Sequence, residues 1–212
     1  MEASEVHDHW KDIGGGIRPS VVLIASSALI LACPLLALVP ALKSEAWVAW
    51  VLALLLLGVA LIVSGIRPWL SWVALVPGGI AVVQSVGLAF TLIGMTQFAG
   101  IYAFLSLPRA LSILALALVE RKNIAPHRRL VLALAGGLSA LKIVLDPILA
   151  IPEKWVPVLD AAVLVVLAVA LFMLAQGLRH REREWASRRF ADSNASFSDF
   201  NPPKETSDEV EG

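Results

Sequence analysis

Six long hydrophobic runs, separated by short polar segments, make up most of this chain. An α-helix rises about 1.5 Å per residue and the hydrocarbon core of a bilayer is about 30 Å thick, so about 20 apolar residues span it. Six segments meet this requirement, near residues 18–39, 46–66, 71–94, 98–119, 129–151 and 156–178. Backbone groups in lipid must be hydrogen-bonded internally, which favours helices. The pattern therefore predicts an all-α, polytopic membrane protein with six transmembrane helices.

Composition agrees with this class. Of the 212 residues, 58% are hydrophobic and 16% are charged, and the mean hydropathy of +0.79 is far above that of water-soluble domains. We therefore expect the lipid bilayer to be the main partner of the chain, and we expect no nucleic-acid binding. The single cysteine, Cys33, excludes an intrachain disulfide.

Basic residues indicate how the helices are oriented. With the N-terminus inside, the outer loops carry only Lys43 and Lys154. The inner segments carry the remaining flanking charges, which are Lys11, Arg18, Arg67, Arg121, Lys122, Arg128, Arg129, Arg179, Arg181, Arg183, Arg188 and Arg189. This asymmetry follows the positive-inside rule and predicts a cell-membrane protein with both termini in the cytoplasm.

Five tryptophans near the predicted helix ends are typical of interfacial anchors, although ordinary packing explains any one of them equally well. They are Trp47, Trp50, Trp69, Trp72 and Trp155.

Outside the predicted spans the chain changes character. The four predicted parts are a flexible cytoplasmic N-terminus (1–17), the transmembrane domain (18–178), a basic juxtamembrane segment (179–190) and an acidic, disordered tail (191–212). The juxtamembrane segment is either a helix lying on anionic lipid or a solvated extension of the sixth helix. In the first case the lipid would be bound by Arg179, Arg181, Arg183, Arg188 and Arg189.

Polar residues inside the predicted spans are the candidates for function, because such residues are rare in lipid and tend to face the bundle interior. On the fifth span, Ser139, Lys142 and Asp146 have i, i+3, i+7 spacing and share one face. Tyr102, Ser106 and Arg109 lie along one stripe of the fourth. The candidate ligand-binding cluster comprises Gln84, Arg109, Lys142, Asp146 and Asp160.

The predicted depth of these side chains matters. Lys142 and Arg109 are expected eight to eleven residues below the outer boundary, or roughly 12 to 16 Å. Lys142 can pair with Asp146 at i, i+4, which leaves Arg109 and Asp160 to pair across helices or to face water. Three interpretations are open: an ion-pair network that fixes helix packing, an outward cavity that binds a small polar or anionic ligand, and side chains that extend to the headgroups.

Small residues predict a further packing feature. Ala133, Gly137 and Ala140 offer a close-packing seam on the fifth span.

No catalytic signature appears in the chain: there is no HExxH, GxSxG, Walker or dinucleotide motif. The four histidines, His7, His9, His127 and His180, all lie outside the spans, which argues against axial haem ligation. We therefore expect a protein that is not an enzyme and that carries no metal or other cofactor.

The helices also read as three similar hairpins, each with a small-residue start and a basic inner flank. The starts are SSALIL, GGIAVV and GGLSAL, and the flanks are GIRP, VERKN and GLRHR, about 55 residues apart. In these features, and in a proline near the outer end of the first helix of the unit, residues 20–181 resemble the HdeD family. The resemblance implies a six-helix bacterial membrane protein that is related to envelope or acid stress or acts as a partner-binding scaffold. The alternative is a small transporter or a substrate-binding transport subunit.

Overall fold

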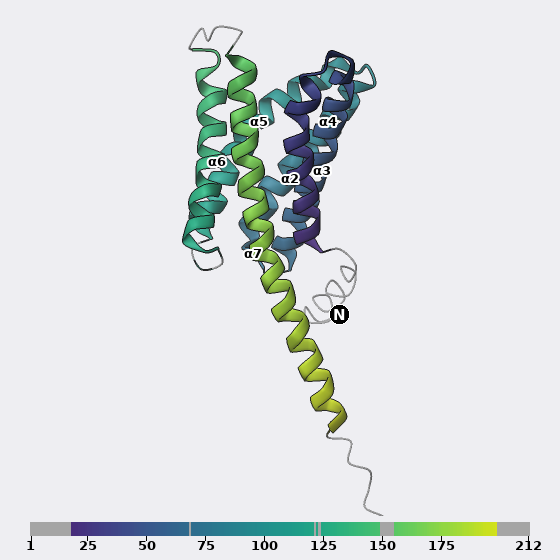
Figure 1. Ribbon diagram of the computed structural model, residues 1–212, viewed down its shortest axis with the longest axis vertical. Helices are drawn as coiled ribbons and strands as arrows, with labels where there is room; N and C mark the ends of the chain where they lie inside the picture. Colours follow the sequence, from purple (N-terminus) through teal and green to yellow (C-terminus); the bar gives the residue numbers. More distant parts are fainter. Residues whose placement is uncertain (1–17, 68, 121, 123, 149–154, 199–212) are drawn as a thin grey trace, which may run out of the picture. The chain divides into compact units, whose positions relative to one another are not determined.

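The computed structural model describes residues 18–67, 69–120, 122, 124–148 and 155–198. In this part of the chain all regular structure is helical, and no strand is present. The α-helices are α2 (Pro19–Ala37), α3 (Lys43–Ile66), α4 (Leu75–Leu92), α5 (Ala99–Val119), α6 (Pro126–Leu145) and α7 (Val156–Ser198) (Figure 1). Short 3-10 helices, η1 (Pro40–Leu42), η2 (Trp72–Ala74) and η3 (Thr96–Phe98), lie between them. The six predicted helices are thus present, in the predicted order.

Five of the six helices are long and apolar enough to cross a membrane. These segments are Pro19–Ala37, Ser44–Ile66, Trp72–Leu92, Thr96–Val119 and Val156–Glu184. The remaining helix, α6, starts with the polar sequence PHRR and carries Lys142 in its last turn, so its uninterrupted apolar stretch is shorter. The predicted crossing of the membrane by α6 therefore stays a prediction.

Two predicted helix boundaries differ clearly from the structure. The fifth span was expected to end near residue 151, but α6 ends at Leu145. The sixth was expected to end near residue 178, but α7 continues through Ser198, across the basic segment and into the first residues of the predicted tail. By contacts the chain forms two units, Met1–Arg179 and His180–Gly212. The predicted N-terminal segment 1–17, with His7 and His9, and residues 199–212 lie outside the described part.

Within the first unit the helices pack in the order of the sequence. α2 contacts α3, α3 contacts α4, α4 contacts α5, and α5 contacts α6. α7 lies beside α6 (Figure 1), and the two are joined by an ion pair described below. From α2 to α6, each helix is joined to the next by a short connection. Short connections make consecutive helices antiparallel neighbours.

Glycines allow two pairs of helices to approach closely. A Cβ atom on Gly58 of α3 would lie 2.7 Å from the carbonyl oxygen of Gly78 on α4, so neither position tolerates a side chain. At the α5–α6 contact, a Cβ atom on Gly136 would lie 2.7 Å from the backbone nitrogen of Leu114. The predicted seam through Gly137 was wrong by one residue, because no atom lies within 4 Å of a Cβ placed there.

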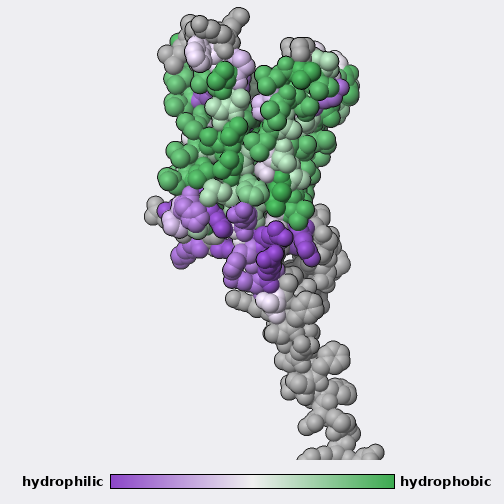
Figure 2. Space-filling view, in the orientation of Figure 1, coloured by the Kyte–Doolittle hydropathy of each residue, from purple (hydrophilic) through white to green (hydrophobic). Residues whose placement is uncertain are grey.

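The interior of the bundle is apolar and the surface is apolar as well. Leu54, Leu57, Leu116 and Leu171 are almost completely buried, while many other leucines and valines are exposed on the helix faces. Figure 2 shows these hydrophobic side chains covering the visible faces of the helices. A surface of this kind is typical of a protein whose solvent is lipid rather than water.

The only cysteine, Cys33, is buried in this interior. Its Sγ donates a hydrogen bond to the carbonyl oxygen of Leu29, 3.1 Å away, and lies 3.7 Å from that of Ala46. The thiol therefore forms part of the α2–α3 contact.

Candidate polar site within the bundle

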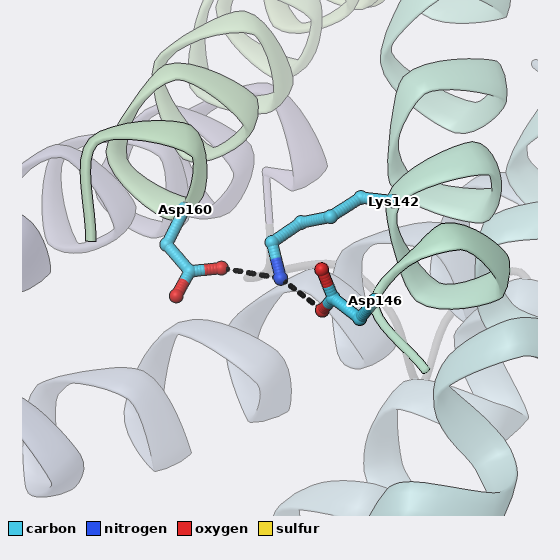
Figure 3. A network of polar contacts seen from close by, with 3 residues as sticks. All are labelled: Lys142, Asp146 and Asp160. Carbon is cyan, nitrogen blue, oxygen red and sulfur yellow. Dashed lines mark hydrogen bonds and ion pairs between the residues drawn. The ribbon is translucent and has the colours of Figure 1, made fainter. Parts of the chain in front are cut away.

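Lys142 lies between two carboxylates that come from different helices. Its Nζ atom is 2.5 Å from Oδ2 of Asp146, at the end of α6, and 2.7 Å from Oδ1 of Asp160 on α7 (Figure 3). The predicted i, i+4 pair is therefore confirmed. Asp160 also pairs with Lys142, whereas a pairing with Arg109 was one of the expectations. The triad of Lys142, Asp146 and Asp160 joins α6 to α7.

The triad lies at the end of the helices and not deep within them. Lys142 is three residues from Leu145, the last residue of α6, or about 5 Å along the axis. The predicted depth of Lys142, roughly 12 to 16 Å below the outer membrane boundary, stays a prediction. Pro147 explains the early end, because it has no N–H to continue the helical hydrogen-bond ladder. Accordingly, the side chains of Asp146 and Asp160 are 39% and 49% exposed.

A second polar cluster links α3, α4 and α5, and it is buried. The side chain of Gln84 donates hydrogen bonds to the carbonyl oxygen of Tyr102 at 2.9 Å and to Oγ of Ser106 at 3.2 Å. From α3, the indole Nε1 of Trp50 donates to the Tyr102 hydroxyl at 2.7 Å. The predicted stripe of Tyr102, Ser106 and Arg109 on α5 thus faces the neighbouring helices α3 and α4.

Arg109 is the deepest charge in this cluster. It lies ten residues into α5, about 15 Å from the start of the helix, and is 8% exposed. Its guanidinium carbon is 5.4 Å from the centre of the Trp50 ring, a cation–π contact. No described residue accepts a hydrogen bond from its buried Nη1 atom. A buried charge without a counter-ion is costly. An anion or a polar group that reached this guanidinium would therefore stabilise it.

The predicted five-residue cluster is therefore divided in two. Gln84 and Arg109 belong to the buried cluster, while Lys142, Asp146 and Asp160 form the triad at the end of α6 and α7. No ion pair between Arg109 and either aspartate is present in the part of the chain that is described. The buried cluster also contains an unpaired acceptor, because Oε1 of Gln84 has no hydrogen-bond partner there.

The tryptophans predicted as interfacial anchors fall into two groups. Trp47, Trp72 and Trp155 are about half exposed or more, as anchors would be. Trp50 and Trp69 are buried, and each lies against an arginine, Arg109 and Arg67 respectively.

Sequence reasoning missed Glu120, which is 1% exposed. One of its carboxylate oxygens accepts a hydrogen bond from the backbone N–H of Ser71, so it ties the end of α5 to the connection between α3 and α4. The other oxygen has no partner among the described residues. A signal was available in the sequence, because Glu120 is the only acidic residue between Glu45 and Asp146.

A search of the described residues for groups of three or more His, Cys, Asp or Glu side chains that could hold a metal ion found none.

Comparisons of the chain with protein-family models, with characterised proteins and with solved structures find no match. The resemblance to the HdeD family therefore stays a prediction.

Proposed function

We propose that the protein is a non-enzymatic integral membrane protein of HdeD type, which acts in envelope or acid stress or as a partner-binding scaffold, as the resemblance to the HdeD family implies. In this proposal six transmembrane helices form three hairpins and both termini lie in the cytoplasm. The intramembrane polar groups then serve to hold the helices together.

The observation that carries this proposal is the use of polar side chains between helices. Lipid provides no hydrophobic force that drives helices together, so packing and interhelical hydrogen bonds must supply it. The links are Ser26 to the Ala53 carbonyl (2.9 Å), Ser85 to the Val51 carbonyl (3.0 Å), Trp50 to Tyr102 (2.7 Å), Gln84 to Tyr102 and Ser106 (2.9 and 3.2 Å) and Lys142 to Asp160 (2.7 Å). Most neighbouring helix pairs are covered by this set.

The distribution of charge supports the proposed orientation. Arg67 follows the end of α3, Lys122 follows α5, and Arg128 and Arg129 begin α6. With consecutive helices antiparallel, these residues fall at one end of the bundle, where hydrophilic side chains gather in Figure 2. A cluster of arginine and lysine at one end is what the positive-inside rule favours for the cytoplasmic face.

The proposal is tested by measuring the thermal stability of the protein in detergent and the survival of cells at low pH. Asp160→Asn should lower the melting temperature of the protein in detergent, because it weakens the α6–α7 link, and a broad ligand screen should leave that melting temperature unchanged. In cells, loss of the gene should reduce survival at low pH, and the wild-type gene should restore it. Normal acid survival of the deletion strain would remove the stress role, and a strongly stabilising small ligand would favour transport instead.

A second candidate function, a small-anion transporter or a transport subunit, is favoured by Arg109 alone. Its buried Nη1 atom has no described partner. Ionisable residues within transmembrane segments often mark substrate or ion pathways. The screen should then find small carboxylates or inorganic anions that stabilise the wild type and fail to stabilise Arg109→Met. Arg109→Lys keeps the charge and should retain part of the effect. An unchanged response of Arg109→Met would exclude this residue as the anion site.

A further inference from the structure

An open groove lies between the end of α5 and the start of α6, and its lining includes none of the candidate-cluster residues. Its volume is about 480 Å³. The walls are apolar and consist of Ala117, Leu118, Leu130 and Ala133. Pro126, His127 and Arg129, from the first turn of α6, form the rest of the lining.

The walls of the groove open onto the surface that faces lipid. Leu118, near the end of α5, and Leu130, near the start of α6, are 57% and 62% exposed. Ala117 and Ala133 are small, so they leave a depression between these two leucines. A flexible hydrocarbon chain fits a depression of this kind, because it gains van der Waals contacts with the apolar walls.

The other end of the groove is basic. His127 and Arg129 are the titratable residues among those described in the lining, which include no acidic residue, and the first turn of α6 also has none. Arg128 adds a further charge beside them, with its guanidinium directed toward Gly177 of α7. The groove therefore combines a hydrocarbon-compatible wall with a cationic rim, which is complementary to an anionic lipid.

We propose that this groove binds an anionic phospholipid, with an acyl chain along Leu118 and Leu130 and the phosphate at Arg129 and His127. The proposal goes beyond the scaffold function and rests on its claim that α6 crosses the membrane. Among possible occupants a lipid is favoured over a soluble phosphate compound because the apolar walls form the larger part of the lining. The site differs from the arginines of segment 179–190 that were predicted to contact anionic lipid.

The test uses the full-length protein in detergent with phosphatidylglycerol or phosphatidylcholine of identical acyl chains, and counts bound lipid by native mass spectrometry. We expect phosphatidylglycerol to be retained preferentially. Arg129→Gln should weaken that retention about fivefold, the loss of the attraction of one cation near a lipid surface. Equal retention of the two lipids by the wild type would overturn the proposal.

Two matched variants test the groove itself. Leu130→Trp should fill it and displace the lipid, whereas Leu134→Trp, one turn farther along α6 on an exposed position outside the lining, should not. Equal binding by both variants, each shown by size-exclusion chromatography to remain folded, would also overturn it.

Two further experiments test whether the ligand is a free phosphate compound and whether the lipid binds to the segment after α7 instead. Inorganic phosphate at millimolar concentration should not displace the lipid, and displacement would assign the rim to a free phosphate group. Substituting Arg181 and Arg183 by Gln should leave retention unchanged, and a loss there would move the site to the segment after α7. Lipid selectivity and the effect of Asp160→Asn on stability are independent measurements, so the failure of this proposal and that of the scaffold function can be told apart.

Discussion

The α3–α4 contact and the α6–α7 contact hold helices together by different means. Between α3 and α4, Gly58 and Gly78 bring the backbones together, and Ser85 donates a hydrogen bond to the Val51 carbonyl. Between α6 and α7 the polar contact is the ion pair of Lys142 with Asp160. The first mechanism uses small neutral groups and needs no counter-charge, so it works in the middle of a bilayer. The second uses charges, and it occurs where the helices end and polar groups can be solvated.

Breaking the glycine contact should have the largest effect. Gly78→Leu places a side chain where a Cβ alone would be 3.0 Å from the Gly58 carbonyl oxygen, and α3 and α4 must separate. We expect a loss of about 3 kcal/mol in the free energy of unfolding in detergent. Gly79→Leu is the matched control, because no atom lies within 4 Å of its Cβ position and it gains the same helix propensity. Similar stabilities of the two variants would contradict the described packing.

Removing the cation of the triad should have the next largest effect. Lys142→Met leaves Asp146 and Asp160 without a counter-charge and breaks the described ion pair between α6 and α7. Because the carboxylates are partly exposed, the expected loss of about 2 kcal/mol is below that of a fully buried pair. Thermal unfolding in detergent measures it, with Lys142→Arg as the charge-preserving control. If Lys142→Met were as stable as the wild type, the triad would not hold the two helices.

The buried hydrogen bonds of Gln84 should contribute less. Gln84→Leu removes the two bonds that its amide donates to Tyr102 and Ser106 on α5. Interhelical hydrogen bonds in membranes contribute about 1 kcal/mol, and we expect a destabilisation of this size. The same experiment with Ser139→Ala, which removes a bond within α6 only, should give a smaller change.

Arg109→Met should have the smallest effect, and its sign is informative. The variant loses the contact with the Trp50 ring but also removes a buried donor that has no described acceptor. The lost ring contact destabilises the protein and the removal of the unpaired donor stabilises it. We therefore expect the free energy of unfolding to rise by about 1 kcal/mol or less. A large destabilisation would show that Arg109 holds the bundle together, as Lys142 is expected to do between α6 and α7.

The sequence predicted the helices well and their faces less well. Hydrophobic run length identified all six helices, because crossing lipid requires both a minimum length and internal hydrogen bonds. It placed the end of α6 six residues too far along, since Ile148 and the apolar residues after it continue the hydrophobic pattern beyond Pro147. Composition does not register a missing backbone N–H, so the helix was expected to continue past Pro147.

The candidate site was predicted residue by residue but not as an assembly. Spacing along one helix correctly paired Lys142 with Asp146, because i, i+4 geometry is local. Which residue faces another helix depends on how each helix is rotated about its own axis, and spacing along one helix does not determine that rotation. Gly136 was therefore missed in favour of Gly137, and Asp160 was found beside Lys142 and not Arg109. Glu120 was read as part of a basic flank, although its carboxylate is buried.

The buried thiol of Cys33 has a practical consequence. Thiol reagents need an accessible thiolate, and this sulfur atom is enclosed between α2 and α3, so the native chain should give almost no labelling background. Single cysteines can therefore be introduced without first removing the natural one, for example in place of Lys122 at one end of the bundle and Ser44 at the other. Labelling of intact cells with a membrane-impermeant maleimide would then read the orientation of the helices directly, with the wild-type protein as its own blank.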